Sequence, residues 1–189
     1  TNEYSRKVSH LLRYENQGIL TTYKTINNDN PKLTCRIDGL ENFSPTKIII
    51  DRDLKIKQNS YVLNKSKFQK TIIFHNSKNL KKINFLKKRG TKLIKINTEN
   101  DNYFDLKKIF KIIYDIGIHS ILIESGKIFI NKILSKNLFN EFYLFMSNRS
   151  LRNTNKVNIL DVKRSLNIKF KSRNLVNTYL DKDKLLHYY

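Results

Sequence analysis

The sequence is poor in cysteine and histidine. Cys35 is the one cysteine among 189 residues, and the four histidines are scattered along the chain. A disulfide framework and a cysteine-rich zinc site are therefore excluded. A chain without disulfides is typical of a reducing compartment, so we expect a cytoplasmic protein. Cys35 itself is expected to be a small buried hydrophobic residue.

Long apolar runs and the common catalytic signatures are also missing. No stretch approaches the roughly 18 apolar residues that a membrane-spanning helix needs, and from the first residues we expect no signal peptide. The sequence contains no G-x-G-x-x-G fingerprint, Walker loop, G-x-S-x-G elbow or H-E-x-x-H motif. We therefore expect no membrane partner and no metal site.

Acidic residues are scarce. The chain has 16 Asp and Glu and 37 Lys and Arg, so its net charge is +21. Such a charge suggests nucleic acid or an anionic membrane as a partner. The lysines are dispersed, however, and the dense run Lys87-Lys88-Arg89 falls on the polar face of an expected helix. Lys, Asn and Ile are abundant throughout while Ala and Gly are scarce, which a biased coding sequence would also give. We expect no nucleic-acid partner, and a basic α/β nucleic-acid-binding module stays as the alternative.

Short β-branched runs alternate with amphipathic segments. Strands are expected at 19–21, 47–50, 71–74, 92–96, 121–123 and 141–146, and helices at 2–14, 78–89, 102–116 and 127–135. This alternation predicts βαβ units, and hence an α/β fold with a mostly parallel central sheet flanked by helices. Two late segments of period two, 166–170 and 175–179, predict antiparallel strands at a C-terminal edge. Without a repeat or a linker, we expect one domain over residues 1–189.

Two strand ends open into polar groups. After the strand at 19–21, residues 22–30 are expected to form a loop of Thr, Asn, Lys and Asp, and a short apolar segment at 33–37 follows. The other strand end is Glu124-Ser125-Gly126, where a helix begins at once. Gly126 lets the backbone approach a ligand closely, and the first N–H groups of a helix favour a phosphate. Each piece alone could also be an ordinary surface loop or a structural turn.

Together these pieces resemble the reductase domain of bacterial riboflavin biosynthesis. That family has an Arg at the end of the first helix, then T-x-x-x-D-[DN]-P-x-L-x-x-R, then D-x-x-L after the next strand, and later E-[GS]-G followed by a helix. The resemblance covers residue 1 to about residue 149. The matching residues are Arg13, Thr25, Asp29-Asn30-Pro31, Leu33, Arg36, Asp51-Arg52-Asp53-Leu54, Glu124-Ser125-Gly126 and Leu138-x-x-Glu141.

The resemblance implies a dihydrofolate-reductase-like fold and NADPH-dependent reduction of 5-amino-6-(5-phosphoribosylamino)uracil to its ribityl form. It implies that Arg13, Arg36, the backbone near Leu33 and Glu124 bind this phosphoribosylamino-pyrimidine substrate. It also implies that no side chain is a nucleophile and that Glu124 positions the substrate. The implied cofactor-binding residues are Thr25, Asp29, Gly126, Lys127, Ile128, Phe129, Ile130, Asn131 and Lys132. Because the hydride chemistry belongs to the cofactor, the protein needs only to position and neutralise charge.

The chain also departs from the family pattern. Thr22-Tyr23-Lys24-Thr25 stands where the family often has G-x-G-T, and Glu-Ser-Gly replaces the commoner Glu-Gly-Gly. The family's reductase domain begins with an earlier strand and usually follows a zinc deaminase domain. We therefore expect a fragment of a bifunctional enzyme that lacks that strand and the deaminase domain. Family members commonly dimerise, so we expect a homodimer, and a non-catalytic dimerisation domain is the remaining alternative.

Overall fold

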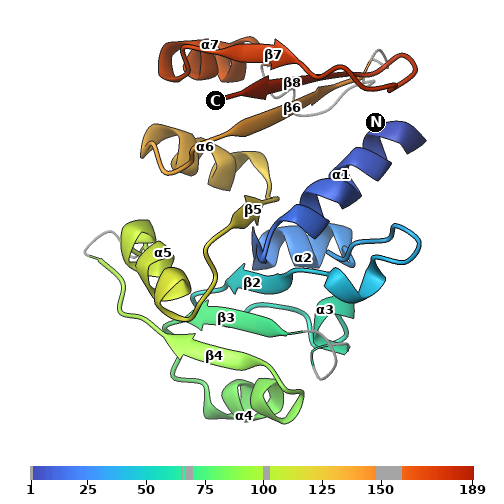
Figure 1. The fold of residues 1–189 in the computed structure, drawn as a ribbon. Coiled ribbons are helices and arrows are strands. Elements are labelled where there is room, and N and C mark those ends of the chain that lie inside the picture. The colour runs from blue at the N-terminus through green and yellow to red at the C-terminus, as the bar shows by residue number, and fades with distance from the viewer. Residues whose placement is uncertain (1, 65, 67–69, 100–102, 148–158) are drawn as a thin grey trace. The chain divides into compact units, whose positions relative to one another are not determined.

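Figure 1 shows the fold in the computed structural model, which describes residues 2–64, 66, 70–99, 103–147 and 159–189. The chain divides into two compact units. The larger unit comprises residues 10–129, and the smaller unit comprises residues 1–9 and 130–189. Two helices, α1 (Glu3–Glu15) and α6 (Lys127–Ser135), begin in one unit and end in the other.

A five-stranded sheet organises the larger unit, with the spatial order β4-β3-β2-β1-β5. Every neighbouring pair is parallel. Parallel neighbours need crossover connections, and these run through helices, as expected from the alternating pattern. The strands are β1 (Gly18–Thr22), β2 (Thr46–Ile50), β3 (Thr71–His75), β4 (Lys92–Lys95) and β5 (Ile121–Ile123).

Helices cover one face of this sheet with a single apolar cluster. Ile19, Ile49 and Ile73 come from neighbouring strands and belong to one buried cluster. Side chains of three helices complete the same cluster, so these helices pack on that face. They are Ile26 from α2 (Tyr23–Asp29), Val62 and Leu63 from α3 (Tyr61–Asn64), and Leu86 from α4 (Leu80–Lys88). A 3₁₀ turn, η1 (Glu41–Phe43), and α5 (Leu106–Asp115) complete the elements of this unit.

The smaller unit contains a three-stranded antiparallel sheet in the order β6-β8-β7. Its elements are β6 (Phe142–Met146), α7 (Ile159–Lys169), β7 (Arg173–Leu175) and β8 (Lys184–Tyr188). The start of α1 is tied to the turn before β8, because the Asn2 N–H and the Ser5 hydroxyl both donate to the Asp183 carboxylate, at 2.8 and 2.7 Å. Asn2 also caps α1, since its Oδ1 accepts from the Ser5 N–H at 2.9 Å.

The strands expected between residues 19 and 146 and all four expected helices are present, within the usual uncertainty of element ends. The parallel sheet and an antiparallel C-terminal sheet are confirmed, although neither of the two late segments forms the strand expected there. Gly90 has a positive φ of 81° after α4, the left-handed conformation that commonly ends a helix. The expected helix at 102–116 begins at Leu106, and residue 102 lies outside the described residues. None of the described helices is long and apolar enough to cross a membrane.

Three expectations were wrong. Residues 23–29 form the short helix α2 and not a loop, because Ile26 packs into the core cluster and holds two turns in place. Residues 166–169 belong to α7 and not to a strand, since Leu166 is fully buried while Ile168 is 87% exposed along one helix. The strand expected at 175–179 ends at Leu175, and β7 begins at Arg173. The described part of the segment 53–67 contains α3 and four buried apolar side chains, Leu54, Ile56, Val62 and Leu63.

Candidate functional site

The order of the strands locates the candidate site. The chain moves from β1 outward through β2, β3 and β4, and then returns to place β5 on the other side of β1. At such a reversal the connections leave the sheet in opposite directions, and open α/β sheets bind ligands outside the carboxyl ends of the two strands that meet there. Here those ends are Thr22 and Ile123. The Glu124 N–H donates to the Leu20 carbonyl at 3.0 Å. This bond fixes the position of the residues that follow β5 relative to the end of β1.

Three hydroxyl groups meet at this reversal. Thr22 ends β1, Thr25 lies in the first turn of α2, and Ser125 lies between β5 and α6. The Thr22 and Thr25 hydroxyl oxygens are 3.3 and 3.2 Å from the Ser125 oxygen, and 3.4 Å from each other. The Gly126 N–H donates to Thr25 Oγ1 at 3.3 Å. We call Thr22, Thr25 and Ser125 the hydroxyl cluster.

An ion pair lies next to the hydroxyl cluster in the chain. Arg13, in the last turn of α1, donates from Nε to Glu124 Oε1 at 2.8 Å and from Nη2 to Oε2 at 2.9 Å. This two-point geometry is the strongest that the two side chains can form. The Arg13 side chain is 13% exposed and the Glu124 side chain 31% exposed, so the carboxylate is oriented by the guanidinium while part of it still faces outward.

The same guanidinium holds the segment that follows Leu33. Arg13 Nη1 donates to the Thr34 carbonyl at 3.1 Å, and His10 Nδ1 lies 3.0 Å from the same oxygen. Because a carbonyl oxygen only accepts, the proton of the neutral imidazole is on Nδ1. Burial, and then the positive charges of Arg13 and Arg36, lower the pKa of His10, although the Thr34 carbonyl and Glu124 oppose this shift. His10 is therefore neutral at pH 7 and acts as a structural donor.

The backbone between α2 and Thr34 is unusually constrained. Asn30 and Leu33 have positive φ angles of 42° and 52°, in the left-handed region that side chains other than glycine avoid. At Asn30 this geometry ends α2, since its N–H donates to the Ile26 carbonyl at 3.0 Å. Leu33 is 2% exposed and packs into the core cluster. Burial of its side chain and the Arg13 bond to Thr34 together fix a backbone that would otherwise relax.

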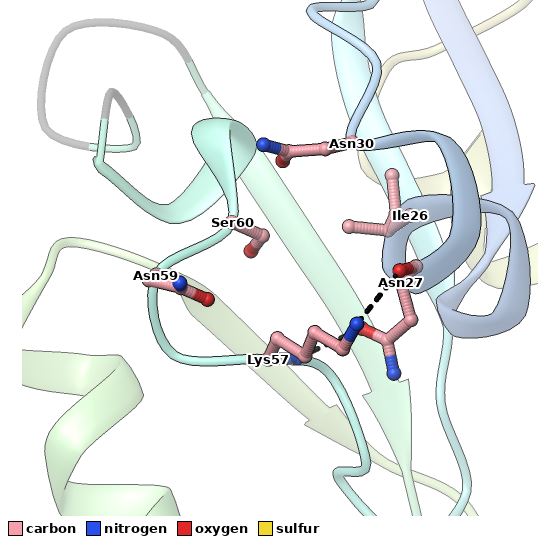
Figure 2. Close-up of a pocket in the computed structure, with 6 residues that line it drawn as sticks. All are labelled: Ile26, Asn27, Asn30, Lys57, Asn59 and Ser60. Carbon is pink, nitrogen blue, oxygen red and sulfur yellow. Dashed lines mark hydrogen bonds between the residues drawn. The ribbon is translucent and has the colours of Figure 1, made fainter.

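The other side of α2 borders a small hollow of about 160 Å³ (Figure 2). Its lining residues are Ile26, Asn27, Asn30, Lys57, Asn59 and Ser60. Asn27 accepts from the Lys57 N–H at 2.9 Å and donates to the Lys55 carbonyl at 2.9 Å, so its amide ties the helix to the loop. The Ser60 hydroxyl is buried and has no hydrogen-bond partner among the described residues. A hollow of this volume suits a few water molecules.

The surroundings of Gly126 offer more phosphate-binding groups than this hollow does. A Cβ atom placed on Gly126 would meet no atom within 4 Å, so the space over this backbone is open. The hydroxyl cluster borders the same backbone, and the nine residues of α6 begin immediately after it. Hydroxyl groups, an uncovered glycine and a helix N-terminus are the groups that bind a diphosphate. Among the described residues, no group of His, Cys, Asp and Glu could hold a metal ion.

Comparison with known proteins gives the family. A family model described as the RibD C-terminal domain matches residues 1–173. The chain belongs to this family. It is 29% identical over 147 residues to the riboflavin biosynthesis protein RibD of Aquifex aeolicus, covering 78% of this chain and 39% of that protein. It is 24% identical over 148 residues to RibD of Bacillus amyloliquefaciens, covering 78% of this chain and 38% of that one. The chain thus spans about two fifths of these relatives.

Solved structures agree in fold. RibD of Acinetobacter baumannii, form 2, has a TM-score of 0.73 at 16% identity over 100% of this chain and 51% of its own. The riboflavin biosynthesis reductase Rib7 of Saccharomyces cerevisiae has a TM-score of 0.70 at 21% identity over 99% of this chain and 80% of its own. The resemblance to the RibD reductase family and the dihydrofolate-reductase-like fold, both expected from the sequence, are confirmed.

The structure brings some of the expected residues of this RibD-family site together and leaves others apart. Arg13 binds Glu124, and Thr25 binds Gly126. Asp29 is exposed at the end of α2, one turn beyond Thr25, so both can lie on one side of the helix. Arg36 is exposed, although its charge lowers the pKa of His10. The remaining expected residues lie in the first six positions of α6, where Lys127, Ile128 and Asn131 are exposed and Phe129, Ile130 and Lys132 are partly buried.

Sequence reasoning missed four participants. Thr22 and Ser125 lie inside the quoted motifs, but neither was expected to bind anything. His10 lies one helical turn before Arg13, so its proximity to the site could have been expected from helix geometry. The Thr34 carbonyl is a backbone group, and no sequence signal marks it.

Proposed function

We propose that this RibD-family chain carries a reductase site that uses NADPH to reduce 5-amino-6-(5-phosphoribosylamino)uracil to its ribityl form in riboflavin biosynthesis. The observation that carries this proposal is the adjacency of two polar groups at the strand-order reversal. The Arg13–Glu124 pair and the hydroxyl cluster are joined through the consecutive residues Glu124 and Ser125. A charged group and a phosphate-binding backbone can thus act on two ligands side by side.

We assign the cofactor to the hydroxyl-cluster side. Thr25, Asp29, Gly126 and the first six residues of α6, Lys127 to Lys132, would hold it. When bound, a reduced nicotinamide supplies the hydride. The chain's own contribution is to orient and to neutralise. The open space over Gly126 and the Thr25 hydroxyl support this assignment.

The substrate belongs on the Arg13–Glu124 side. Arg36 is exposed and positively charged, as a residue that binds a sugar phosphate must be before its ligand arrives. Three N–H groups of Arg13 already bind Glu124 and Thr34. We therefore assign Arg13 mainly to holding the Glu124 carboxylate toward the substrate and to fixing the backbone beyond Leu33. A carboxylate oriented in this way can accept hydrogen bonds from a hydroxylated or amino-substituted ligand.

The chain spans about two fifths of the length of its RibD relatives. The proposed activity therefore corresponds to one part of those longer proteins. The proposal includes the RibD-like arrangement in which residues 1–189 act as a single reductase domain of a bifunctional enzyme. It also includes a homodimer, which sedimentation analysis would detect as a particle of twice the 22.5 kDa chain mass.

Titration of the chain with NADPH, followed by the fluorescence of the reduced nicotinamide, tests the cofactor assignment. We expect saturable binding in the micromolar range that Thr25→Ala and Asp29→Ala each weaken. Asp115→Ala is the matched control, because Asp115 ends α5 and its ion pair among the described residues is with exposed Lys111. NADPH consumption should then depend on the phosphoribosylamino-pyrimidine. A chain that binds RNA tightly and salt-dependently but does not bind NADPH would favour the nucleic-acid alternative instead.

A further inference from the structure

Ser125 belongs to the hydroxyl cluster but has no role in the assignments above. Its oxygen lies 3.3 Å from the hydroxyl oxygen of Thr22, on β1, and 3.2 Å from that of Thr25, on α2. It is the one member that comes from the β5 side of the strand-order reversal. Its hydroxyl therefore links the segment after β5 to the segment after β1 by side-chain contacts, in addition to the backbone bond between Glu124 and Leu20.

Counting protons shows what these contacts can do. Each hydroxyl has one proton to donate and two lone pairs to accept. Thr25 Oγ1 accepts from the Gly126 N–H, which leaves it one lone pair and its own proton. If the three hydroxyls donate around a ring, all three protons are used. The oxygen–oxygen distances of 3.2 to 3.4 Å exceed the usual 2.7 to 2.8 Å, so these bonds are weak and exchange readily for bonds to a ligand.

Contact with Ser125 also limits the rotation of the Thr25 side chain. The Thr25 side chain can rotate about one torsion, and its staggered positions direct the hydroxyl to different neighbours. Contact with Ser125 on one side and with the Gly126 N–H on the other favours one of these positions. In this position the hydroxyl lies beside the open space over Gly126.

We propose that Ser125 is a positioning residue that holds the Thr25 hydroxyl toward a nicotinamide cofactor bound over Gly126. This inference rests on the proposed function, because the ligand is the same cofactor. It adds that Ser125 acts through Thr25, and that the serine in Glu-Ser-Gly strengthens cofactor binding in this chain.

A double-mutant cycle on NADPH affinity tests the inference. Ser125→Ala removes one hydrogen-bonding hydroxyl and should raise the Kd for NADPH about 3- to 10-fold. Ser125→Thr keeps the hydroxyl and should stay within about 2-fold of the unsubstituted chain. In a Thr25→Val background, Ser125→Ala should add less than about 2-fold, because the group on which it acts is gone. Ser135→Ala, at the last residue of α6, is the matched control and should change nothing.

Amide hydrogen exchange at Gly126 gives a readout that needs no cofactor. If Ser125 holds Thr25, then Ser125→Ala should speed this exchange, because Thr25 Oγ1 leaves the Gly126 N–H more often. Independent losses of affinity in the double mutant, or an unchanged Kd in Ser125→Ala, would overturn the inference. Failure of the unsubstituted chain to bind NADPH, with Gly126 exchange still dependent on Ser125, would instead overturn the proposed function and leave the positioning of Thr25 standing.

Discussion

Glu124→Gln is the most informative single substitution, because it removes one charge and almost no volume. The carboxylate receives two N–H bonds from Arg13, at 2.8 and 2.9 Å. A glutamine can accept one of them, while its amide N–H₂ group would face the guanidinium donors. The substitution therefore breaks half of the paired contact and leaves Arg13 with an uncompensated charge.

The degree of burial decides how much stability this loss costs. Exposed ion pairs contribute about 0 to 1 kcal/mol, whereas breaking a fully buried pair costs roughly 3–5 kcal/mol. With side chains 13% and 31% exposed, this pair lies between those cases. We expect Glu124→Gln to lower the free energy of unfolding by about 1–3 kcal/mol, which for a chain of this length lowers the Tm by roughly 3–10 °C.

Urea unfolding measures the stability term, and Glu3→Gln is the control. Glu3 pairs with Lys7 on the same helix, α1, but with side chains 68% and 66% exposed, so its loss should cost less than about 0.5 kcal/mol. In the same preparations, Glu124→Gln should lower kcat/KM for the pyrimidine about 30- to 100-fold, which is the cost of one charge-assisted hydrogen bond. The Kd for NADPH should stay within about 2-fold. A variant as stable as Glu3→Gln with unchanged turnover would refute the reasoning.

Three further substitutions test the scaffold. Asp51→Ala should cost about 2–4 kcal/mol in urea unfolding, because the buried carboxylate accepts the N–H groups of Lys55 and Ile56 at 2.7 and 2.8 Å. Thr21→Val should be neutral or should stabilise by up to about 1 kcal/mol in the same assay, since the buried Thr21 hydroxyl finds no partner in the described chain. Burial lowers the pKa of His10 below its usual 6.5, so stability should be full above that pH and fall as the pH drops through the lower, folded-state pKa. His10→Gln should reduce this acid-side loss, and a urea midpoint with the same acid dependence in both chains would contradict the assignment.

The strands were predictable because their local pattern and their environment agree. In β2, consecutive isoleucines predict a strand buried on both faces, and Ile48 and Ile49 are both fully buried. The short helix α2 was not predictable in the same way. Its residues are mostly Thr, Asn, Lys and Asp, which favour turns and caps, and Ile26 is its one buried side chain. Tertiary packing of that isoleucine decides the structure, and a local pattern cannot report it.

The error at α7 has a different cause. Leu166, Ile168 and Phe170 alternate with polar residues, which matches a strand over five positions. Positions 166 and 170 are also four apart, so they share one face of a helix. A window of five residues fits both the strand period and the helix period. Only the burial of Leu166, together with the exposure of Ile168, distinguishes the helix from the strand.

The candidate site was predictable as a set of residues but not as a set of contacts. The motif identifies Arg13, Thr25 and Glu124, which lie up to 111 positions apart. Their contacts depend on the parallel register in which Leu20 faces Ile123, since that register sets Glu124 and Ser125 beside the exit of β1. Register between distant strands is fixed by the whole sheet and not by any local stretch. The pairing of Arg13 with Glu124 and the place of Ser125 therefore became visible only once the sheet was assembled.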